Sequence, residues 1–119
     1  MVFYNKSGVA VAYLYNDGVD IYLFDGTPVA YLHEDAVYDF DGNHLGWFDK
    51  GWIRDIQGDC VFFTKDATGG PLKPWTQLAP LKGLRQLKSL KSLRNMPTMR
   101  APDSLSWSKQ SDTNFFKSW

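Results

Sequence analysis

The first 64 residues repeat one pattern of apolar and turn-forming positions. Four segments align without gaps: Phe3–Leu14, Ile21–Leu32, Val37–Phe48 and Ile53–Thr64. At the centre of each stands a glycine after a polar residue: Gly8, Gly26, Gly42 and Gly58. β-Branched and aromatic residues flank these glycines, and glycine adopts the positive φ that a tight turn requires. We therefore predict four consecutive β-hairpins, each with a two-residue turn that ends at its glycine.

Every unit has an aliphatic residue three positions after its glycine and an aromatic residue two positions further on. The aliphatic residues are Val11, Val29, Leu45 and Val61, and the aromatic residues are Tyr13, Tyr31, Trp47 and Phe63. Because side chains alternate along a strand, the aliphatic and aromatic positions are expected to share one face. The opposite face carries the small residues Ala12, Ala30 and Gly46, and the larger Phe62 in the fourth unit.

A single hairpin is only marginally stable in water, so the four hairpins are expected to bury their apolar faces together. The predicted fold class is all-β, with the four hairpins in a pseudo-fourfold radial or barrel-like arrangement over residues 1–71. The fourth unit departs from the repeat, because Arg54 replaces the tyrosine of the other three units, which is Tyr4, Tyr22 or Tyr38.

The segments IYLFDGTPVAYL (21–32) and VYDFDGNHLGWF (37–48), with the Gly69-Gly70-Pro71 sequence that follows the fourth unit, resemble the bacterial four-fold β-flower family. The resemblance covers about residues 1–107 when LKGLRQLKSLKSLR and Leu105–Ser108 are included. It implies four hairpins in pseudo-fourfold arrangement, and it implies no activity and no catalytic residues. A weaker similarity, to WG-type β repeats, rests only on Asp-x-x-Gly followed by an apolar residue.

Residues 72–119 have a different composition and form a predicted tail. From Leu81 to Met99 every third residue is leucine or methionine, and the next residue is almost always basic. This period fits neither an α-helix nor a strand, but polyproline II would place all leucines on one edge and all bases on another. We predict an extended tail, with a short helix over Leu84–Met96 as the alternative.

The zero net charge hides a division along the chain. Residues 1–64 contain 3 basic and 10 acidic residues, and residues 65–119 contain 10 basic and 3 acidic ones. The basic tail is therefore expected to dock on the acidic hairpins of its own or a neighbouring subunit. Leu81–Met99 would extend about 56 Å, so the tail must bend around its own domain or reach another.

Leucines exposed in a row promote aggregation, so the tail leucines are expected to be buried on the acidic hairpins or on a partner chain. Aromatic residues flank the leucine row and are expected to anchor its ends. These anchors are Trp75, Trp107, Phe115, Phe116 and Trp119.

The leading functional hypothesis is a non-enzymatic binding or assembly module that forms homo-oligomers through contact between the basic tail and the acidic hairpins, or that binds another protein. A cytoplasmic location is expected, since the sequence has no signal peptide and no membrane-spanning stretch. The first alternative is low-specificity binding of nucleic acid or another polyanion through the tail. Its candidate residues are Lys82, Arg85, Lys88, Lys91 and Arg94. The second is a small-ligand pocket at a central hub formed by Tyr13, Tyr31, Trp47 and Phe63.

No catalytic, cofactor or metal site is predicted. A two-residue turn would place His44 opposite Asp39, where an exposed polar pair is expected. His33 and its acidic neighbours belong to a surface connection. The Asp39–Asn43 segment lacks the spacing of a calcium loop, and Gly69–Pro74 lacks the Gly-Lys-Ser/Thr sequence before a helix that a phosphate-binding loop requires. Cys60, as the sole cysteine, excludes an intrachain disulfide and is expected to be an ordinary strand residue.

Overall fold

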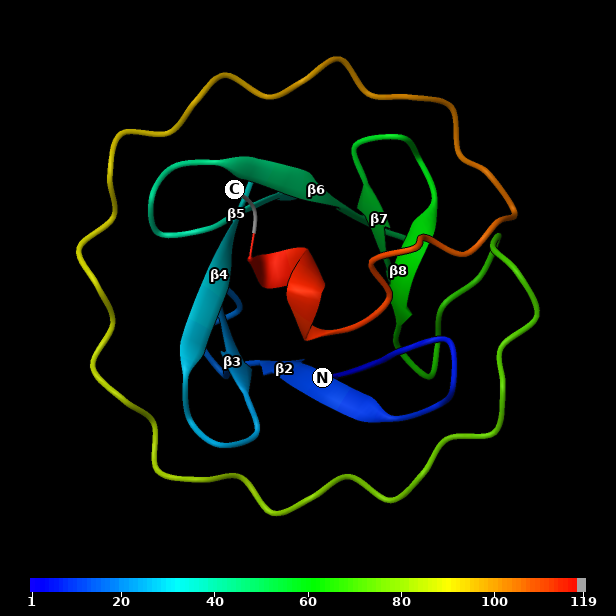
Figure 1. The fold of residues 1–119 in the computed structure, drawn as a ribbon, viewed down its shortest axis with the longest axis horizontal. Coiled ribbons are helices and arrows are strands. Elements are labelled where there is room, and N and C mark those ends of the chain that lie inside the picture. The colour runs from blue at the N-terminus through cyan, green and yellow to red at the C-terminus, as the bar shows by residue number, and fades with distance from the viewer. Residues whose placement is uncertain (118–119) are drawn as a thin grey trace.

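In the computed structural model, which describes residues 1–117, eight short strands form one closed antiparallel barrel in chain order (Figure 1). The strands are β1 (Val2–Tyr4), β2 (Ala10–Leu14), β3 (Asp20–Leu23), β4 (Pro28–His33), β5 (Ala36–Tyr38), β6 (His44–Asp49), β7 (Trp52–Asp55) and β8 (Cys60–Phe63). A short 3₁₀ helix, η1 (Thr113–Phe116), follows near the C-terminus. The predicted all-β fold of four consecutive hairpins is confirmed.

Each hairpin turn is one residue longer than predicted. In the first, the Gly8 N–H donates to the Asn5 carbonyl, and the Asn5 N–H donates to the Val9 carbonyl, both at 2.9 Å. Three residues therefore form the loop, with Gly8 in the left-handed region at φ 80°. Oδ1 of Asn5 also accepts the N–H groups of Ser7 and Val9 at 3.0 Å. Asp39 and Asp55 repeat this side-chain arrangement in the third and fourth turns, and it stabilises the longer loop.

A β-bulge occurs at the same place in all four hairpins, and it makes the predicted face assignment wrong. In the first hairpin Phe3 pairs with Ala12 and Tyr4 pairs with Ala10, which leaves Val11 as the extra residue. The same shift makes Val29, Leu45 and Val61 the extra residues of the other three hairpins. A bulge interrupts the alternation of side chains. The four aliphatic residues therefore pack in the barrel core, whereas the aromatic residues two positions later belong to other clusters.

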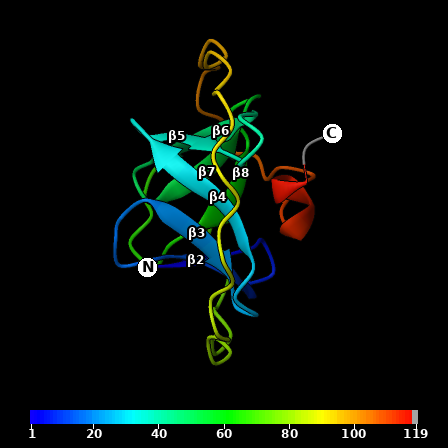
Figure 2. The ribbon, with the colours of Figure 1, turned by 90° about the vertical axis from the view of Figure 1, so that its left-hand side faces the viewer.

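The C-terminal helix η1 closes one end of the barrel. Phe115 and Phe116 belong to the same core cluster as Phe3 and Ile21. The Phe62 ring stacks on Phe116 at 5.5 Å between centroids and meets Phe115 edge-on at 5.9 Å. This contact explains the large residue in the fourth unit, since Phe62 reaches the helix. Figure 2 shows the helix on one side of the molecule.

Residues 72–107, here called the belt, encircle the barrel as an extended chain (Figures 1 and 2). The belt has neither helix nor strand, apart from a single β-bridge between Trp107 and Cys60. At about 3.1 Å per residue its 36 residues span about 112 Å. This length matches the circumference of a molecule measuring 36 × 36 × 24 Å. The extended tail is confirmed, the alternative helix is wrong, and the tail bends around its own barrel.

Candidate interaction surface

Each of the four hairpin turns hydrogen-bonds the belt through the carbonyl of its glycine. The pairs, named from belt N–H to turn carbonyl, are Gln77 to Gly8 at 2.8 Å, Gln86 to Gly26 at 2.9 Å, Asn95 to Gly42 at 2.8 Å and Ser104 to Gly58 at 3.1 Å. The four donors are nine residues apart. The four turns, here called the spokes, therefore fix the belt at four equivalent points.

The glycines are also required because the belt backbone passes very close to them. A Cβ atom built on Gly26 would lie 1.9 Å from the carbonyl oxygen of Leu84, and one on Gly8 would lie 2.0 Å from that of Trp75. Gly42 and Gly58 have the same relation to Leu93 and Pro102. Both the positive φ and the close approach therefore exclude a side chain at these positions.

The even spacing reveals a nine-residue repeat that the three-residue period conceals. The belt divides into four quarters: LKPWTQLAP (72–80), LKGLRQLKS (81–89), LKSLRNMPT (90–98) and MRAPDSLSW (99–107). The sixth position of each quarter carries the polar residue whose N–H binds a turn. That regular amide or hydroxyl residue is the signal that could have identified the repeat from the sequence.

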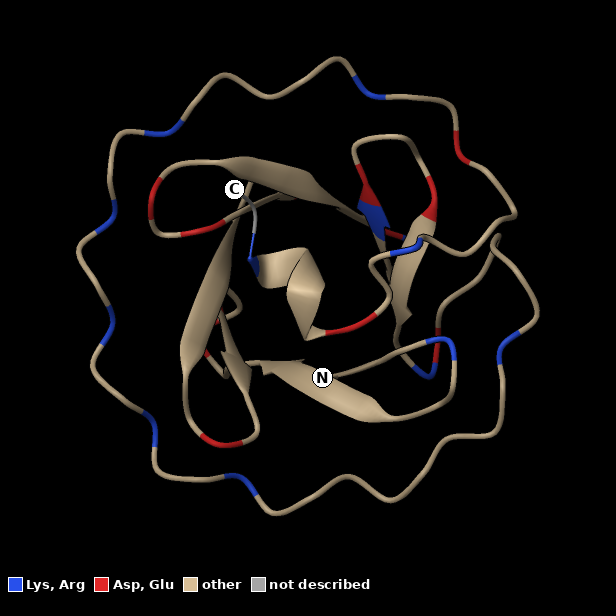
Figure 3. Cartoon of the chain, in the orientation of Figure 1, with Lys and Arg blue, Asp and Glu red and all other residues tan. Residues whose placement is uncertain are grey.

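The basic edge of the belt faces the barrel. Lys82 and Lys91 lie over the rings of Tyr13 and Tyr31, each with Nζ 4.4 Å from the ring centroid, and Arg100 lies over Trp47 at 5.7 Å. These three residues occupy the second position of successive quarters. Figure 3 shows the basic residues distributed around the belt and acidic residues at the enclosed hairpin turns.

Three other basic residues also contact the barrel from the belt. Arg85 lies 3.9 Å from the ring centroid of Tyr15, and Arg94 lies 5.9 Å from that of Tyr38. Nζ of Lys88 donates to Oδ2 of the buried Asp20 at 2.6 Å. The structure thus brings together all five residues of the predicted polyanion site, and each contacts the protein's own barrel.

The aromatic residues of the repeat do not form a central hub, so this part of the prediction is wrong. Tyr13 and Phe63 belong to one cluster, while Tyr31 and Trp47 belong to another. The barrel core is a separate cluster that contains Phe62 instead. Because of the bulge, the aromatic rings lie on the outer side of the barrel, where Tyr13 and Tyr31 contact belt lysines.

In the fourth unit, the contact between a belt arginine and a barrel tyrosine is replaced by an ion pair. Arg54 replaces the tyrosine of the other units, and the belt position that carries Arg85 or Arg94 in the second and third quarters carries Asp103. Nε of Arg54 lies 3.5 Å from Oδ1 of Asp103. The cation is on the barrel in this unit and on the belt in the other two, so the departure from the repeat preserves an attractive contact.

The apolar edge of the belt faces away from the barrel, so the expectation that the leucines are buried on the protein's own hairpins is wrong, and their burial on a partner chain stays a prediction. Eleven large apolar side chains, here called the rim, are 72–98% exposed. They are Leu72, Trp75, Leu78, Leu81, Leu84, Leu87, Leu90, Leu93, Met96, Met99 and Leu105. With three residues per turn, an extended belt that turns its bases inward must turn its leucines outward.

The predicted aromatic anchors have different outcomes. Trp75 is 96% exposed and anchors nothing within the described chain. Trp107 contacts Trp52 and Phe63 at 5.5 and 6.0 Å between centroids, which confirms it as an anchor. Phe115 and Phe116 anchor the end of the tail in the barrel core. Trp119 lies outside the described residues.

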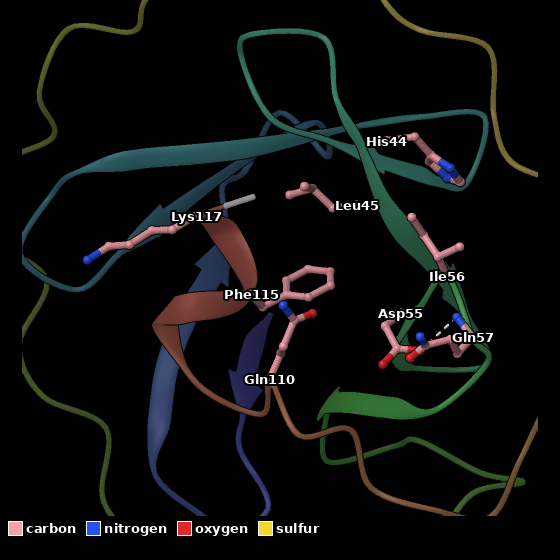
Figure 4. Close-up of a pocket in the computed structure, with 8 residues that line it drawn as sticks. All are labelled: His44, Leu45, Asp55, Ile56, Gln57, Gln110, Phe115 and Lys117. Atoms are coloured by element: carbon pink, nitrogen blue, oxygen red, sulfur yellow. Dashed lines mark hydrogen bonds between the residues drawn. The ribbon is translucent and has the colours of Figure 1, made fainter. Parts of the chain in front are cut away.

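A cavity of about 320 Å³ lies between β6, the turn after β7 and the C-terminal segment that contains η1 (Figure 4). Its lining includes His44, Asp55 and Phe115. His44 pairs with Tyr38 across the hairpin and not with Asp39, because the longer turn shifts the register. The His44 side chain is buried, and its Nδ1 accepts the belt N–H of Thr98 at 3.1 Å. Nε2 is buried without a hydrogen-bond partner in residues 1–117.

Burial lowers the pKa of His44 from its ordinary value of 6.5, although a backbone group of Gly46 opposes the shift. A protonated Nδ1 could not accept the Thr98 N–H. Because the folded-state pKa is depressed, this stabilisation is complete above the unfolded-state pKa of about 6.5 and is lost as the pH falls below it and through the lower folded-state pKa. We expect the free energy of unfolding of the wild type to decrease more between pH 7 and pH 5 than that of His44→Gln, measured by urea unfolding. Parallel pH profiles would contradict this role of His44.

The cysteine and the metal-ligating residue types contribute no further site. Burial raises the pKa of the Cys60 thiol to about 11, which keeps it protonated. Within residues 1–117 there is no group of three or more histidine, cysteine or acidic side chains placed to hold a metal ion. No helix in the same range is long and apolar enough to cross a membrane.

Comparisons with known proteins agree with this architecture. The family model described as "4-fold beta flower protein" matches residues 1–116, which include the hairpins, the belt and η1. Neither the curated proteins nor the solved structures gave a match. The family model covers nearly the whole chain and the structure has the four-hairpin barrel, so the chain belongs to the 4-fold beta flower protein family.

Proposed function

We propose that this protein is a non-enzymatic assembly module that binds further copies of itself through the rim. The observation that carries this proposal is the exposure of eleven large apolar side chains around the whole circumference. Burial of a leucine side chain stabilises by about 1.5–3 kcal/mol, which at about 25 cal/mol per Å² corresponds to about 60–120 Å². The rim thus exposes about 700–1,300 Å², more than the 300–600 Å² of the largest patch on an ordinary monomer.

The regular spacing of the rim favours a second copy as its occupant. From Leu72 to Met99 successive rim residues are three positions apart, which corresponds to about 9.3 Å along an extended chain. A side chain placed midway between two of them would lie about 4.7 Å from each, close to the 4.0–4.5 Å of an apolar contact. Another copy of this chain offers side chains at the same spacing, so two rims can interdigitate.

The basic edge of the belt is less suited to binding a partner. Lys82, Lys91 and Arg85 already lie over tyrosine rings, and Lys88 pairs with Asp20. A phosphate group would have to compete with these intramolecular contacts. This observation favours self-association through the rim over polyanion binding.

Substitution of three rim leucines tests the proposal. Leu84, Leu87 and Leu90 are 94–97% exposed, so replacing all three with glutamine removes apolar surface without opening the core. We expect the free energy of unfolding to change by less than about 0.5 kcal/mol. Wild-type self-association, measured by sedimentation velocity from micromolar to millimolar concentration, should weaken at least several-fold in this variant.

Methionine at the same three positions is the matched control, since it keeps the surface apolar and should retain association. A wild type that stays monomeric throughout the concentration range would overturn the proposal, as would a glutamine variant that associates like the wild type. A monomeric wild type that binds DNA or lipid vesicles would overturn it in favour of that partner.

A further inference from the structure

We infer that the quarters of the belt act as separate binding edges, three strong and one weak, so that one molecule joins up to three neighbours in a plane. This inference rests on the proposed self-association and adds its valence and geometry. It follows from how the spokes divide the rim, from the composition of each quarter and from the flat shape of the belt.

The spokes hold the middle rim residue of each quarter most firmly. The backbone carbonyls of Trp75, Leu84 and Leu93 lie directly against the turn glycines, and the N–H two residues later bonds the same glycine. Their side chains nevertheless point away from the barrel and are 94–96% exposed. An apolar side chain on a fixed backbone loses less conformational entropy on binding than one on a mobile backbone. Each spoke therefore marks the centre of one binding edge.

The fourth quarter differs from the other three. Its middle position is Pro102, which cannot reach as far as tryptophan or leucine, and Leu105 is only 72% exposed. Arg100, in the same quarter, pairs with both Asp103 and Asp49, and all three side chains are partly exposed. A neighbour docked here would bury less apolar area and would desolvate an ion-pair cluster. The fourth edge is therefore the weak one.

The shape of the molecule places these edges in one plane. The belt is a single chain thick and forms the outer edge of a molecule that measures 36 × 36 × 24 Å, so the belt encircles the barrel in the wide plane, as the edge-on view shows (Figure 2). Rim side chains consequently radiate within the belt plane. Because two convex rims curve away from each other, an edge engages about three side chains from each copy, which buries about 400–700 Å². Stable pairs usually bury at least about 1,200 Å², so single contacts are weak and several edges act together.

Variants that retain one edge or two test this valence. In the first variant only the second quarter (81–89) keeps its rim residues, and those of the other quarters become glutamine. We expect it to stop at dimers. In the second, the first and third quarters keep theirs, and because these lie on opposite sides we expect linear chains. In the third, only the fourth quarter keeps its rim residues, and we expect monomers. Sedimentation velocity gives the sizes, and electron microscopy separates chains from planar sheets.

Single substitutions give a second measurement if the multiple variants fail to fold. Leu84→Gln, at the centre of a strong edge, should weaken association several-fold, whereas Pro102→Gln, at the centre of the weak edge, should leave it unchanged. Equal effects of the two substitutions would overturn the assignment of strong and weak edges. Dimers as the largest wild-type species, or assemblies larger than dimers from the second quarter alone, would overturn the valence but leave self-association intact. A wild type without any association would instead overturn the proposed function.

Discussion

Replacing Arg54 with methionine is expected to lower the free energy of unfolding by about 3–5 kcal/mol, the largest effect of any single substitution considered. Nη1 of Arg54 donates to the carbonyls of Gly58 and Ser104, both at 2.7 Å, and Nη2 donates to that of Gly69 at 3.0 Å. This one side chain, only 3% exposed, thus joins a hairpin turn, the end of the belt and the segment that leads into it. Methionine would leave the three carbonyls without this donor.

Chemical unfolding followed by tryptophan fluorescence measures this effect. Arg54→Lys keeps the charge but loses the planar guanidinium group with its several N–H donors, so an intermediate loss of stability is expected. This variant remains informative if the methionine variant does not fold. Asp103→Asn is the control for the ion pair alone. Asp103 is 38% exposed, so its substitution should cost no more than about 1 kcal/mol. If Arg54→Met costs no more than Asp103→Asn, Arg54 does not act through the three carbonyls.

Alanine in place of Gly26 is expected to destabilise the protein by about 3 kcal/mol. About 1–2 kcal/mol comes from forcing alanine into the left-handed region, where Gly26 lies at φ 98°. The rest comes from the belt, because the new Cβ would lie 1.9 Å from the Leu84 carbonyl oxygen. The belt must move away there and lose its hydrogen bond from Gln86 to Gly26. Trypsin should then cleave faster after Arg85 and Lys88, which provides a local measurement.

Gly18→Ala is the matched control for this substitution. Gly18 also occupies a turn at positive φ, 72°, but nothing lies within 4 Å of a Cβ built there. The Gly18→Ala variant should therefore be destabilised only by the conformational cost of about 1–2 kcal/mol, and trypsin cleavage of its belt should be unchanged. Equal stability losses and equal cleavage rates for the two variants would show that the belt does not depend on the spoke glycines.

The local elements of this protein follow from its sequence. Four glycines among β-branched and aromatic residues predicted the hairpins, because only glycine readily takes the positive φ of Gly8 or Gly26. A leucine at every third residue predicted the extended belt with leucines and bases on separate edges, because only a conformation with three residues per turn separates them. Both predictions depend on short-range backbone geometry, which the sequence contains directly.

The site followed from the sequence only in part. The charge division correctly brought the basic tail to the hairpins, but it did not reveal that Lys82 and Lys91 would lie over tyrosine rings. The faces of the hairpins were misassigned because a bulge adds one residue, and Val11 therefore packs in the core while Tyr13 lies outside it. Alternation along an unbroken strand cannot anticipate such an insertion.

The tertiary structure alone decided which edge of the belt remains exposed. The sequence determined that leucines and bases lie on opposite edges, and either edge could in principle have faced the barrel. The outer side of the barrel presents tyrosine rings, the buried carboxylate of Asp20 and the glycine carbonyls of the turns, which together attract cations and N–H groups. These groups come together only when the barrel closes, since they belong to strands and turns far apart in the chain. Their attraction for the basic edge leaves the leucines facing outward.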